Sequence, residues 1–203
     1  MIRNLVFDYG GVIVNLHDST VRQAFMDLRV SLWKQVIHRK RIKRLMGEFI
    51  DGVRPTNEVV AEMHALCGSR VSLSQLHQVL SLLAGELPPS RLERIVALRK
   101  RYKVYVLSNI NDILWQTCVR QISHAGRSVE ECFDGVFLSY EMGVAKPDEA
   151  IYRQMLAETG MNPAETLYFD DRRDNVEAGR RMGFVASQVV TNQLEQNPLF
   201  AAL

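Results

Sequence analysis

The stretch that decides the fold is Leu5-Val6-Phe7-Asp8-Tyr9-Gly10-Gly11-Val12-Ile13-Val14. Residues 5–7 form a short apolar run typical of a buried strand, and this run ends on the carboxylate Asp8, which is followed two positions later by a pair of glycines. In open α/β sheets, ligands bind at the carboxyl ends of the strands, so Asp8 lies where chemistry is expected. A simpler alternative is that Asp8 only initiates a turn, which Asp does readily next to glycine.

The pattern of apolar residues changes twice along the rest of the chain. From residue 15 to about residue 88, apolar residues recur three and four positions apart, which predicts helices, including one that opens at Thr56 and one that opens at Ser72 or Ser74. From residue 89 onwards, helical and strand patterns alternate, with strands expected at 103–107, 135–138, 166–169 and 184–190. The sequence therefore predicts an α/β fold, in which a Rossmann-like parallel sheet lies between helices and carries an inserted all-helical cap. The expected domains are an α/β core of residues 1–14 and 89–203 and a helical cap of residues 15–88.

Composition excludes several classes of function. The chain has 203 residues and a formal net charge of +2, which is too mild for a dedicated nucleic-acid binder. No apolar run is long enough to cross a membrane, and the three cysteines share no metal-ligand spacing. We therefore expect a cytoplasmic protein that acts on a small molecule, with neither nucleic acid nor membrane as a partner. The only dense basic run, residues 38–44, is interpreted as a solvated helix face rather than as a means of attracting anionic substrates.

Polar residues also end the other predicted strands. Ser108-Asn109 follows the second strand, Asp170-Asp171 follows the fourth, and Lys146-Pro147 lies in the loop after the third. Each has a simple structural explanation, since Ser, Asn and Asp often cap helices and most lysines are exposed. Because the carboxyl ends of parallel strands meet at one edge of a sheet, the whole set is better explained as a single site.

These residue types suit the transfer of a phosphoryl group to a carboxylate. An Asp anion that attacks a phosphate is repelled by like charge, so cations have to neutralise the pair. Asp8 and Asp171 offer the oxygen ligands that Mg²⁺ prefers. The Ser108 hydroxyl can donate to a phosphate oxygen, and Lys146 can hold both the phosphate and the nucleophile.

Four segments, taken in order, resemble the motifs of the haloacid dehalogenase-like hydrolase superfamily: Phe-Asp8-Tyr-Gly-Gly-Val, Leu-Ser108-Asn109, Lys146-Pro147 and Phe-Asp170-Asp171-Arg-Arg-Asp174-Asn175. The resemblance covers nearly the whole chain. It is closest to a bacterial branch of small phosphatases that includes an α-glucose-1-phosphate phosphatase, and to the N-terminal phosphatase domain of soluble epoxide hydrolase.

The resemblance implies a role for each motif residue. Asp8 would be the nucleophile that forms an aspartyl-phosphate, and Ser108, Asn109 and Lys146 would bind the phosphate, with Lys146 also assisting catalysis. The cofactor would be Mg²⁺, held by Asp8, the backbone carbonyl of Gly10 and Asp171. Asp170 and Asn175 would lie around the metal as outer ligands or orienting groups. The substrate would be a small phosphorylated metabolite selected by the cap.

One position departs from the family pattern. Most phosphatases of the superfamily carry a second Asp two residues after the nucleophile, where this chain has Gly10. A glycine cannot transfer protons, and such transfer typically contributes about 10²–10⁴-fold to a rate. We therefore expect either a slow phosphatase or a substrate, such as a sugar 1-phosphate, whose leaving group needs little protonation.

Three alternative functions remain open from the sequence. Loss of the acid-base Asp is compatible with a metal-binding regulatory domain that no longer turns over. A metal-free haloacid dehalogenase is disfavoured by the acidic pair Asp170-Asp171, which such enzymes lack. A phosphomutase is disfavoured because it normally needs the Asp that Gly10 replaces.

Overall fold

A five-stranded parallel sheet forms the centre of the molecule, in the order β3-β2-β1-β4-β5. The structure is a computed structural model and describes residues 1–28, 38–68 and 71–203. The strands are β1 (Asn4–Phe7), β2 (Lys103–Ser108), β3 (Gly135–Leu138), β4 (Thr166–Asp170) and β5 (Val185–Gln188). β1 is central, and Phe7 pairs with Val106 of β2 and with Phe169 of β4. The carboxyl ends of these three strands therefore lie side by side.

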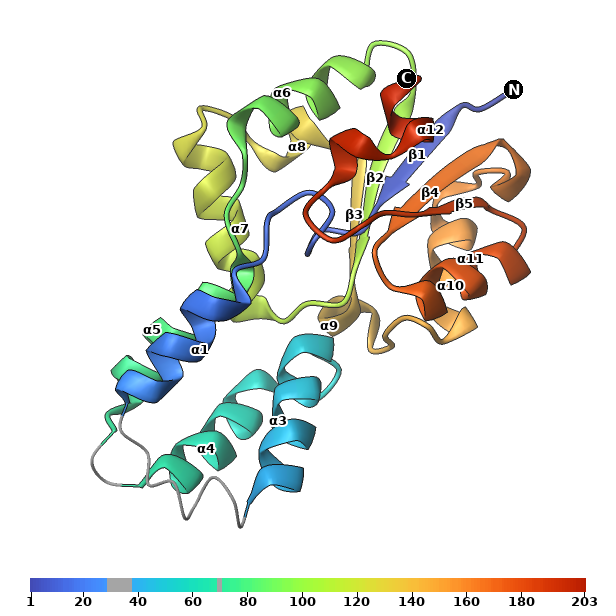
Figure 1. Ribbon diagram of the computed structural model, residues 1–203. Helices are drawn as coiled ribbons and strands as arrows, with labels where there is room; N and C mark the ends of the chain where they lie inside the picture. Colours follow the sequence, from blue (N-terminus) through green and yellow to red (C-terminus); the bar gives the residue numbers. More distant parts are fainter. Residues whose placement is uncertain (29–37, 69–70) are drawn as a thin grey trace.

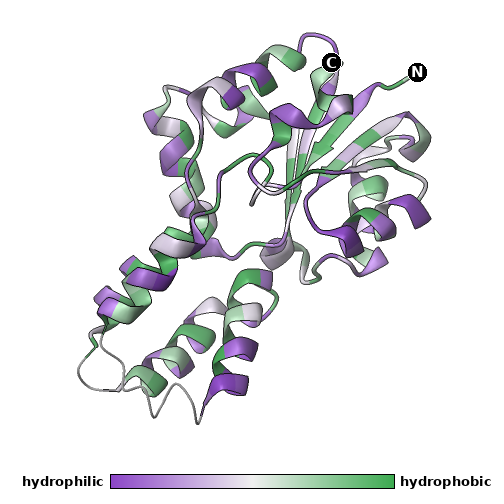
Figure 2. Cartoon of the chain, in the orientation of Figure 1, coloured by the Kyte–Doolittle hydropathy of each residue, from purple (hydrophilic) through white to green (hydrophobic). Residues whose placement is uncertain are grey.

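Burial on both faces explains why the strands are continuous apolar runs. All four residues of β1 and all five of β4 are buried, as expected for a parallel sheet covered by helices on each side. Figure 2 shows the strands as mainly hydrophobic, while the surrounding helices carry hydrophilic residues on their outer sides. The apolar pattern of residues 5–7 therefore places β1 inside the sheet and Asp8 at its end.

Two layers of helices cover the sheet. One face packs on α6 (Pro89–Leu98), α7 (Asp112–His124), α8 (Val129–Cys132) and α12 (Pro198–Ala201), where the ring of Phe200 meets those of Phe7 and Phe169 edge-on. The other face packs on α10 (Glu149–Thr159) and α11 (Arg173–Arg181) through Tyr152 and Tyr168. The short elements are α9 (Ser139–Met142) and the 3-10 turns η2 (Pro163–Glu165) and η3 (Leu194–Gln196). This sandwich fixes the strand ends (Figure 1).

The segment between β1 and α6 is helical. It contains α1 (Asp18–Asp27), α3 (Arg39–Asp51), α4 (Thr56–Cys67), α5 (Leu73–Ser81) and the 3-10 turn η1 (Leu82–Ala84). We call these elements the helical insertion. Ser72 begins α5 with a capping box to Gln75, as the sequence predicts, and Gly52 ends α3 in the left-handed region with φ 67°. Trp33, Val36 and Ile37, which continue the helical pattern in the sequence, lie outside the described residues.

The carboxyl end of α3 attaches the helical insertion to the core. Asn111 donates from Nδ2 to the Phe49 carbonyl, and the Ser139 hydroxyl donates to the Asp51 carbonyl. A Cβ on Gly52 would overlap the Ile110 carbonyl, so this contact requires a glycine. In Figure 1 the end of α3 accordingly lies beside α9, below the sheet.

The predicted fold class is confirmed, and the strands differ from prediction only at their ends. The strand expected at 184–190 is shorter, at Val185–Gln188, because Val189 and Val190 already belong to the loop that follows. Within the basic run, Arg41 and Arg44 form ion pairs with Glu62 of α4, and Arg44 also pairs with Glu48. No helix among the described residues is long and apolar enough to cross a membrane.

Candidate active site

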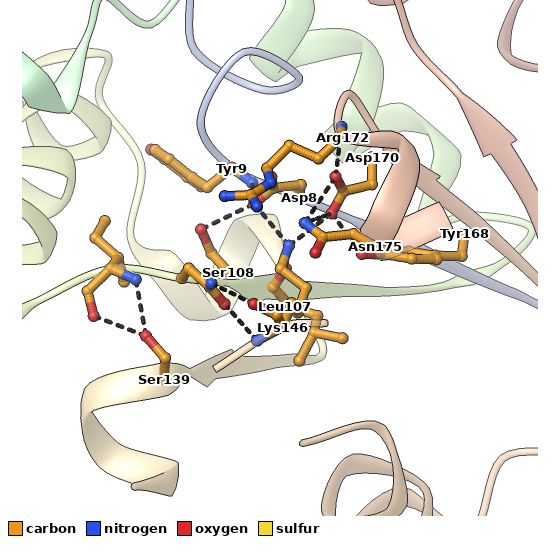
Figure 3. A network of polar contacts seen from close by, with 12 residues as sticks. Asp8, Tyr9, Leu107, Ser108, Ser139, Lys146, Tyr168, Asp170, Arg172 and Asn175 are labelled. Carbon is orange, nitrogen blue, oxygen red and sulfur yellow. Dashed lines mark hydrogen bonds and ion pairs between the residues drawn. The ribbon is translucent and has the colours of Figure 1, made fainter. Parts of the chain in front are cut away.

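Three strand ends and one loop bring the predicted site residues together. Asp8, Ser108 and Asp170 stand at the ends of β1, β2 and β4, and Lys146 reaches them from the loop between α9 and α10 (Figure 3). The Ser108 hydroxyl donates to Asp8 Oδ1 over 3.0 Å, and the Tyr9 backbone N–H donates to the same oxygen over 2.7 Å. The residues named from four separate motifs thus form one cluster.

Lys146 is the buried cation of this cluster. Its side chain has 0% exposure, and its Nζ lies 3.0 Å from Asp8 Oδ1 and 2.7 Å from Asp170 Oδ2. Nζ also donates to the Leu107 carbonyl over 2.6 Å. Burial alone would lower the pKa of Lys146, but the neighbouring carboxylates of Asp170 and Asp8 outweigh it and raise the pKa. Lys146 is therefore a fixed positive charge, and the alternative of an exposed loop lysine is wrong.

The surroundings of Asp8 disfavour its ionised form. Its pKa is raised from 3.8 to about 7, chiefly by burial, while the Lys146 charge lowers it in part and the charges of Asp170 and Asp171 add to the rise. All three contacts described above fall on Oδ1, and within the described residues no hydrogen bond or ion pair engages Oδ2. This oxygen is open for a metal or for attack on a substrate.

Asp170 and Asp171 are neighbours in sequence but have different surroundings. Both oxygens of Asp170 accept hydrogen bonds, from Lys146, Tyr168, Asn175 and the Arg172 backbone N–H. Asp171 is half-buried and accepts one side-chain hydrogen bond, at Oδ2 over 2.8 Å. Burial raises the pKa of Asp171, an effect that this hydrogen bond partly offsets. Asp170 therefore holds Lys146 in place, whereas Asp171 Oδ1 accepts no side-chain hydrogen bond from the described residues and is available to bind a metal.

The donor set fits Mg²⁺. Asp8, Asp170 and Asp171 each offer a carboxylate oxygen, and these oxygens lie within 4.8 Å of one another. Close carboxylates repel unless a cation joins them, and hard oxygen donors suit Mg²⁺. The buried Oδ1 of Asn175 finds no hydrogen-bond partner in the described part of the chain, as expected where a metal or its water belongs.

The two glycines after Tyr9 have different reasons to be there. Gly11 has φ 72°, and a Cβ on it would lie 2.5 Å from Asp171 Oδ2, so only glycine lets this loop approach the carboxylate. Gly10 has ordinary backbone geometry, and a Cβ on it would meet only the Leu16 methyls, at 3.9 Å. No steric reason therefore requires glycine at position 10.

Asn109 lies beside the cluster with its amide fully engaged. Its Nδ2 donates to the Lys146 carbonyl over 2.9 Å and to Asp51 Oδ1 over 3.1 Å, and its Oδ1 accepts from the Lys146 backbone N–H over 2.8 Å. The side chain thus holds the backbone of Lys146 on both sides and also contacts α3. Its predicted role in binding the phosphate could then be played only by its backbone.

The helix-capping explanations do not account for these residues. Asn111, not Ser108 or Asn109, caps α7, through a hydrogen bond from the Leu114 N–H. At α11 the N-cap position is Arg172, whose side chain makes no capping bond. Asp170 accepts from the Arg172 N–H but also holds Lys146, so it has more than a local role.

Sequence reasoning missed several residues that hold the site in place. Arg91, 3% exposed, donates to the carbonyls of Val12 and Ile13 in the loop after the nucleophile and forms a bidentate pair with Glu195. Thr191 is the donor to Asp171. None belongs to a recognisable motif, since each acts through contacts distant in sequence, and only the three-dimensional structure reveals them.

Two cavities in the described part of the chain lie away from this cluster, at the helical insertion. One of about 510 Å³ lies within the helical insertion, between α1, α3, α4 and α5, and is lined mainly by apolar residues such as Phe25, Met46 and Met63. The cluster of charged groups and this cavity therefore lie in different parts of the molecule. The charged groups define the candidate active site, because they converge at the strand ends, whereas the walls of the cavity offer few polar partners.

The haloacid dehalogenase-like hydrolase family matches residues 2–183, which is most of the chain. The protein belongs to this family, and the resemblance expected from the four motifs is confirmed.

Its relatives include named phosphatases and solved structures. A D-ribitol-5-phosphate phosphatase from Bacteroides thetaiotaomicron is 31% identical, over 93% of this chain and 92% of the relative. A haloacid dehalogenase family enzyme from the same organism, solved in complex with magnesium and inorganic phosphate, has a TM-score of 0.85 at 27% identity, covering 95% of this chain and 96% of that one. A predicted hydrolase of the same kind from Porphyromonas gingivalis has a TM-score of 0.85 at 28% identity, covering 100% of this chain and 97% of that one.

Proposed function

We propose that this protein is a magnesium-dependent phosphatase that hydrolyses a small phosphorylated metabolite, with Asp8 as the nucleophile. The observation that carries the proposal is the convergence of Asp8, Lys146 and Asp171 at the strand ends. One buried cation and a cluster of carboxylates suited to a second cation surround a nucleophile whose outer oxygen is open. The named phosphatase relative and the magnesium and phosphate complex of a structural relative support this assignment.

The residues of the chain divide the chemistry between them. Asp8 Oδ2 attacks phosphorus, the bond from phosphorus to the substrate oxygen breaks, and the alcohol leaves with a proton from solvent. Water then attacks the aspartyl-phosphate and releases inorganic phosphate, restoring Asp8. Lys146 and the Ser108 hydroxyl neutralise and orient the transferred group.

Mg²⁺ is the cofactor, and it supplies a second positive charge against the phosphate oxygens when bound. We assign Asp8, the Gly10 carbonyl and Asp171 as its protein ligands, because carboxylate oxygens of Asp8 and Asp171 lie within 4.8 Å of each other. Asp170 and Asn175 act around them, since Asp170 is committed to Lys146 and Asn175 donates from Nδ2 to Asp170.

The substrate class follows from Gly10. Without an acid beside the nucleophile, the leaving oxygen has to depart with little help, which favours good leaving groups or a low rate. The relative that acts on D-ribitol 5-phosphate makes polyol and sugar phosphates the first compounds to test. A sugar 1-phosphate has a better leaving group than a polyol phosphate.

We assign residues 15–88 as the cap domain that selects the substrate and residues 1–14 and 89–203 as the catalytic core. The carboxyl end of α3 supports this division, because Asp51 accepts a hydrogen bond from Asn109, and Asn109 also donates to the Lys146 carbonyl. The buried thiols of Cys118 and Cys132, which form no disulfide, support work in the reducing cytoplasm.

The test is a screen of phosphorylated metabolites and p-nitrophenyl phosphate, with Mg²⁺ and with a chelator. We expect phosphate release that requires Mg²⁺ and falls to background in Asp8→Asn. The exposed carboxylate Asp27 gives a matched control, and Asp27→Asn should retain full activity.

Other outcomes would support the alternative functions. Mg²⁺ binding without release of phosphate from any compound would indicate a regulatory domain that has lost turnover through Gly10. Halide release from a haloacid in the presence of chelator would indicate a dehalogenase. Unchanged phosphatase activity in Asp8→Asn would remove Asp8 from the role of nucleophile.

A further inference from the structure

The loop after β5 contacts both the carboxylate of Asp171 and the segment by which the chain enters the helical insertion, residues 11–17, which we call the entry segment. We call residues 190–193 the β5 loop. Thr191 donates from Oγ1 to Asp171 Oδ2 over 2.8 Å. The next residue, Asn192, binds Leu16, two positions before α1 begins. Adjacent residues of one loop thus touch parts of the molecule that lie far apart in sequence.

Asn192 binds the entry segment through both the backbone N–H and the backbone carbonyl of Leu16. Its Oδ1 accepts from the Leu16 N–H over 2.7 Å, and its Nδ2 donates to the Leu16 carbonyl over 3.0 Å. Its own N–H donates to the Gly11 carbonyl over 2.7 Å. Three hydrogen bonds from one residue therefore fix the segment between the nucleophile and α1.

The backbone at this position is adapted to the contact. Asn192 has φ 68°, and it is the only residue other than glycine with positive φ in the described part of the chain. Such a conformation costs energy for most residues and marks a place where the surroundings impose it. Asparagine is among the few side chains that tolerate it.

Gly11 and Arg91 complete the connection. A Cβ on Gly11 would lie 2.5 Å from Asp171 Oδ2 and 2.9 Å from Thr191 Cγ2, so the entry segment, the carboxylate and the β5 loop meet at one point. Arg91 then binds the Asn192 carbonyl, Glu195 and Asn15 Oδ1. Since Asn15 pairs with Glu86 in the segment between η1 and α6, by which the chain returns to the core, both connections of the insertion are tied to the β5 loop.

We propose that Thr191 is a positioning residue for Asp171 and that Asn192 couples this carboxylate to the entry segment of the helical insertion. The proposal rests on the proposed function, because it takes Asp171 as a Mg²⁺ ligand. Groups that orient metal ligands typically change metal affinity about 10–100-fold when removed. Because the bond from Thr191 to Asp171 is solvent-exposed, we expect the lower end of this range.

The first experiment measures Mg²⁺ binding by calorimetry without substrate. Thr191→Val removes the hydroxyl at nearly constant shape and should weaken Mg²⁺ binding about ten-fold, while Thr191→Ser should restore the affinity. Val190→Ala, at an exposed neighbour, is the control and should bind as the wild type does. Equal Mg²⁺ affinity in Thr191→Val and wild type would overturn the positioning role. Absence of Mg²⁺ binding in the wild type would instead contradict the proposed function.

The second experiment measures hydrogen exchange at the Leu16 amide. Asn192→Gly keeps the positive φ but removes both bonds to Leu16, so this amide should exchange at least about ten-fold faster while the protein stays folded. Saturating Mg²⁺ should slow exchange at Leu16 in the wild type and have less effect in Asn192→Gly. An exchange rate at Leu16 that does not respond to Mg²⁺ in the wild type would overturn the coupling.

Discussion

The strand ends and the helical insertion hold their charged side chains in opposite ways. At the strand ends, Lys146 and Asp170 have no exposure, and their charges are fixed by several hydrogen bonds each. In the helical insertion, Arg54 binds Glu48 and Glu62 from a position in contact with water, and Glu62 also pairs with Arg41. At the strand ends, burial of the charged groups costs desolvation free energy and fixes their orientation. In the helical insertion the charged groups remain hydrated, so their ion pairs contribute little free energy and can rearrange.

Under the proposed division into core and cap, this difference keeps the fixed charges in the catalytic part and the exchangeable ones in the part that selects the substrate. A buried, fully bonded cation is already in place before substrate arrives, so little reorganisation accompanies reaction. Exposed ion pairs are screened by water and salt and can be exchanged in evolution at little loss of stability.

The largest expected effect distinguishes two carboxylates bonded to the same lysine. In Asp170→Asn, Asp8 is the only carboxylate left beside the buried Lys146, and it does not fully compensate the lysine charge because its own pKa is raised. We therefore expect the free energy of unfolding of the metal-free protein to fall by about 3–5 kcal/mol. Asp8→Asn removes a carboxylate whose pKa is raised and leaves the Lys146–Asp170 pair intact, so stability should be equal or higher. Urea unfolding of both variants measures this contrast. Equal losses in the two variants would show that the region does not divide its charges as described.

The next effect concerns the two glycines after Tyr9. The Cβ of Gly10→Asp would meet only the Leu16 methyls, and the variant places a carboxylate where most family phosphatases have one, so kcat should rise at least about ten-fold. Gly11→Ala is the opposite case, because its Cβ would clash with Asp171, and Mg²⁺-dependent activity should be lost. Steady-state kinetics with one substrate compare the two. A Gly10→Asp variant that folds but gains no rate would show that the leaving group needs no acid.

A smaller effect is expected where the helical insertion touches the core. Asp51→Ala removes the acceptor for Asn109 and should lower the free energy of unfolding by about 1–3 kcal/mol. Asp51→Asn keeps an acceptor oxygen and should stay close to wild type. Chemical denaturation gives both values. If Asp51→Ala were as stable as wild type, the carbonyl contact between Asp51 and Ser139 would suffice to hold α3.

The smallest expected effect is the difference between pH 6 and pH 8 in the amount by which Mg²⁺ raises the thermal stability. Burial raises the pKa of Asp8 from 3.8 to about 7, so between these values the folded protein binds a proton more tightly than the unfolded chain does. Stability of the metal-free protein therefore falls as pH rises from about 4 to 7. Mg²⁺ replaces the proton, so it should raise Tm more at pH 8 than at pH 6. Asp8→Asn should lose most of this difference; an equal response in that variant would assign the effect to another group.

The sequence predicts the fold and the centre of the site because both follow from local patterns. Apolar runs that stop on Asp8, Ser108 and Asp170 identify strand ends, and parallel strands bring such ends together. The burial of Lys146 could not be predicted, because a lysine in a loop is ordinarily exposed and only two carboxylates from other strands make its burial favourable.

The surrounding residues could not be predicted for a related reason. Thr191, Asn192 and Arg91 act on groups far away in the sequence, and no spacing rule connects a loop after the fifth strand to the loop after the first. The positive φ of Asn192 likewise has no local signal, since no glycine or turn motif marks the Thr191-Asn192-Gln193 segment.

The central position of β1 has a consequence for synthesis on the ribosome. Leu5 pairs with Val104 and Leu167, so the first strand to be made needs partners translated about 100 and 160 residues later. At roughly 5–20 residues per second, β1 waits on the order of 8–32 s for β4. Lys146 and Asp170, which flank Asp8 in the folded protein, are likewise made only in the last third of the polypeptide. The Asp8 carboxylate therefore has no electrostatic partner from the site until that part of the chain has emerged.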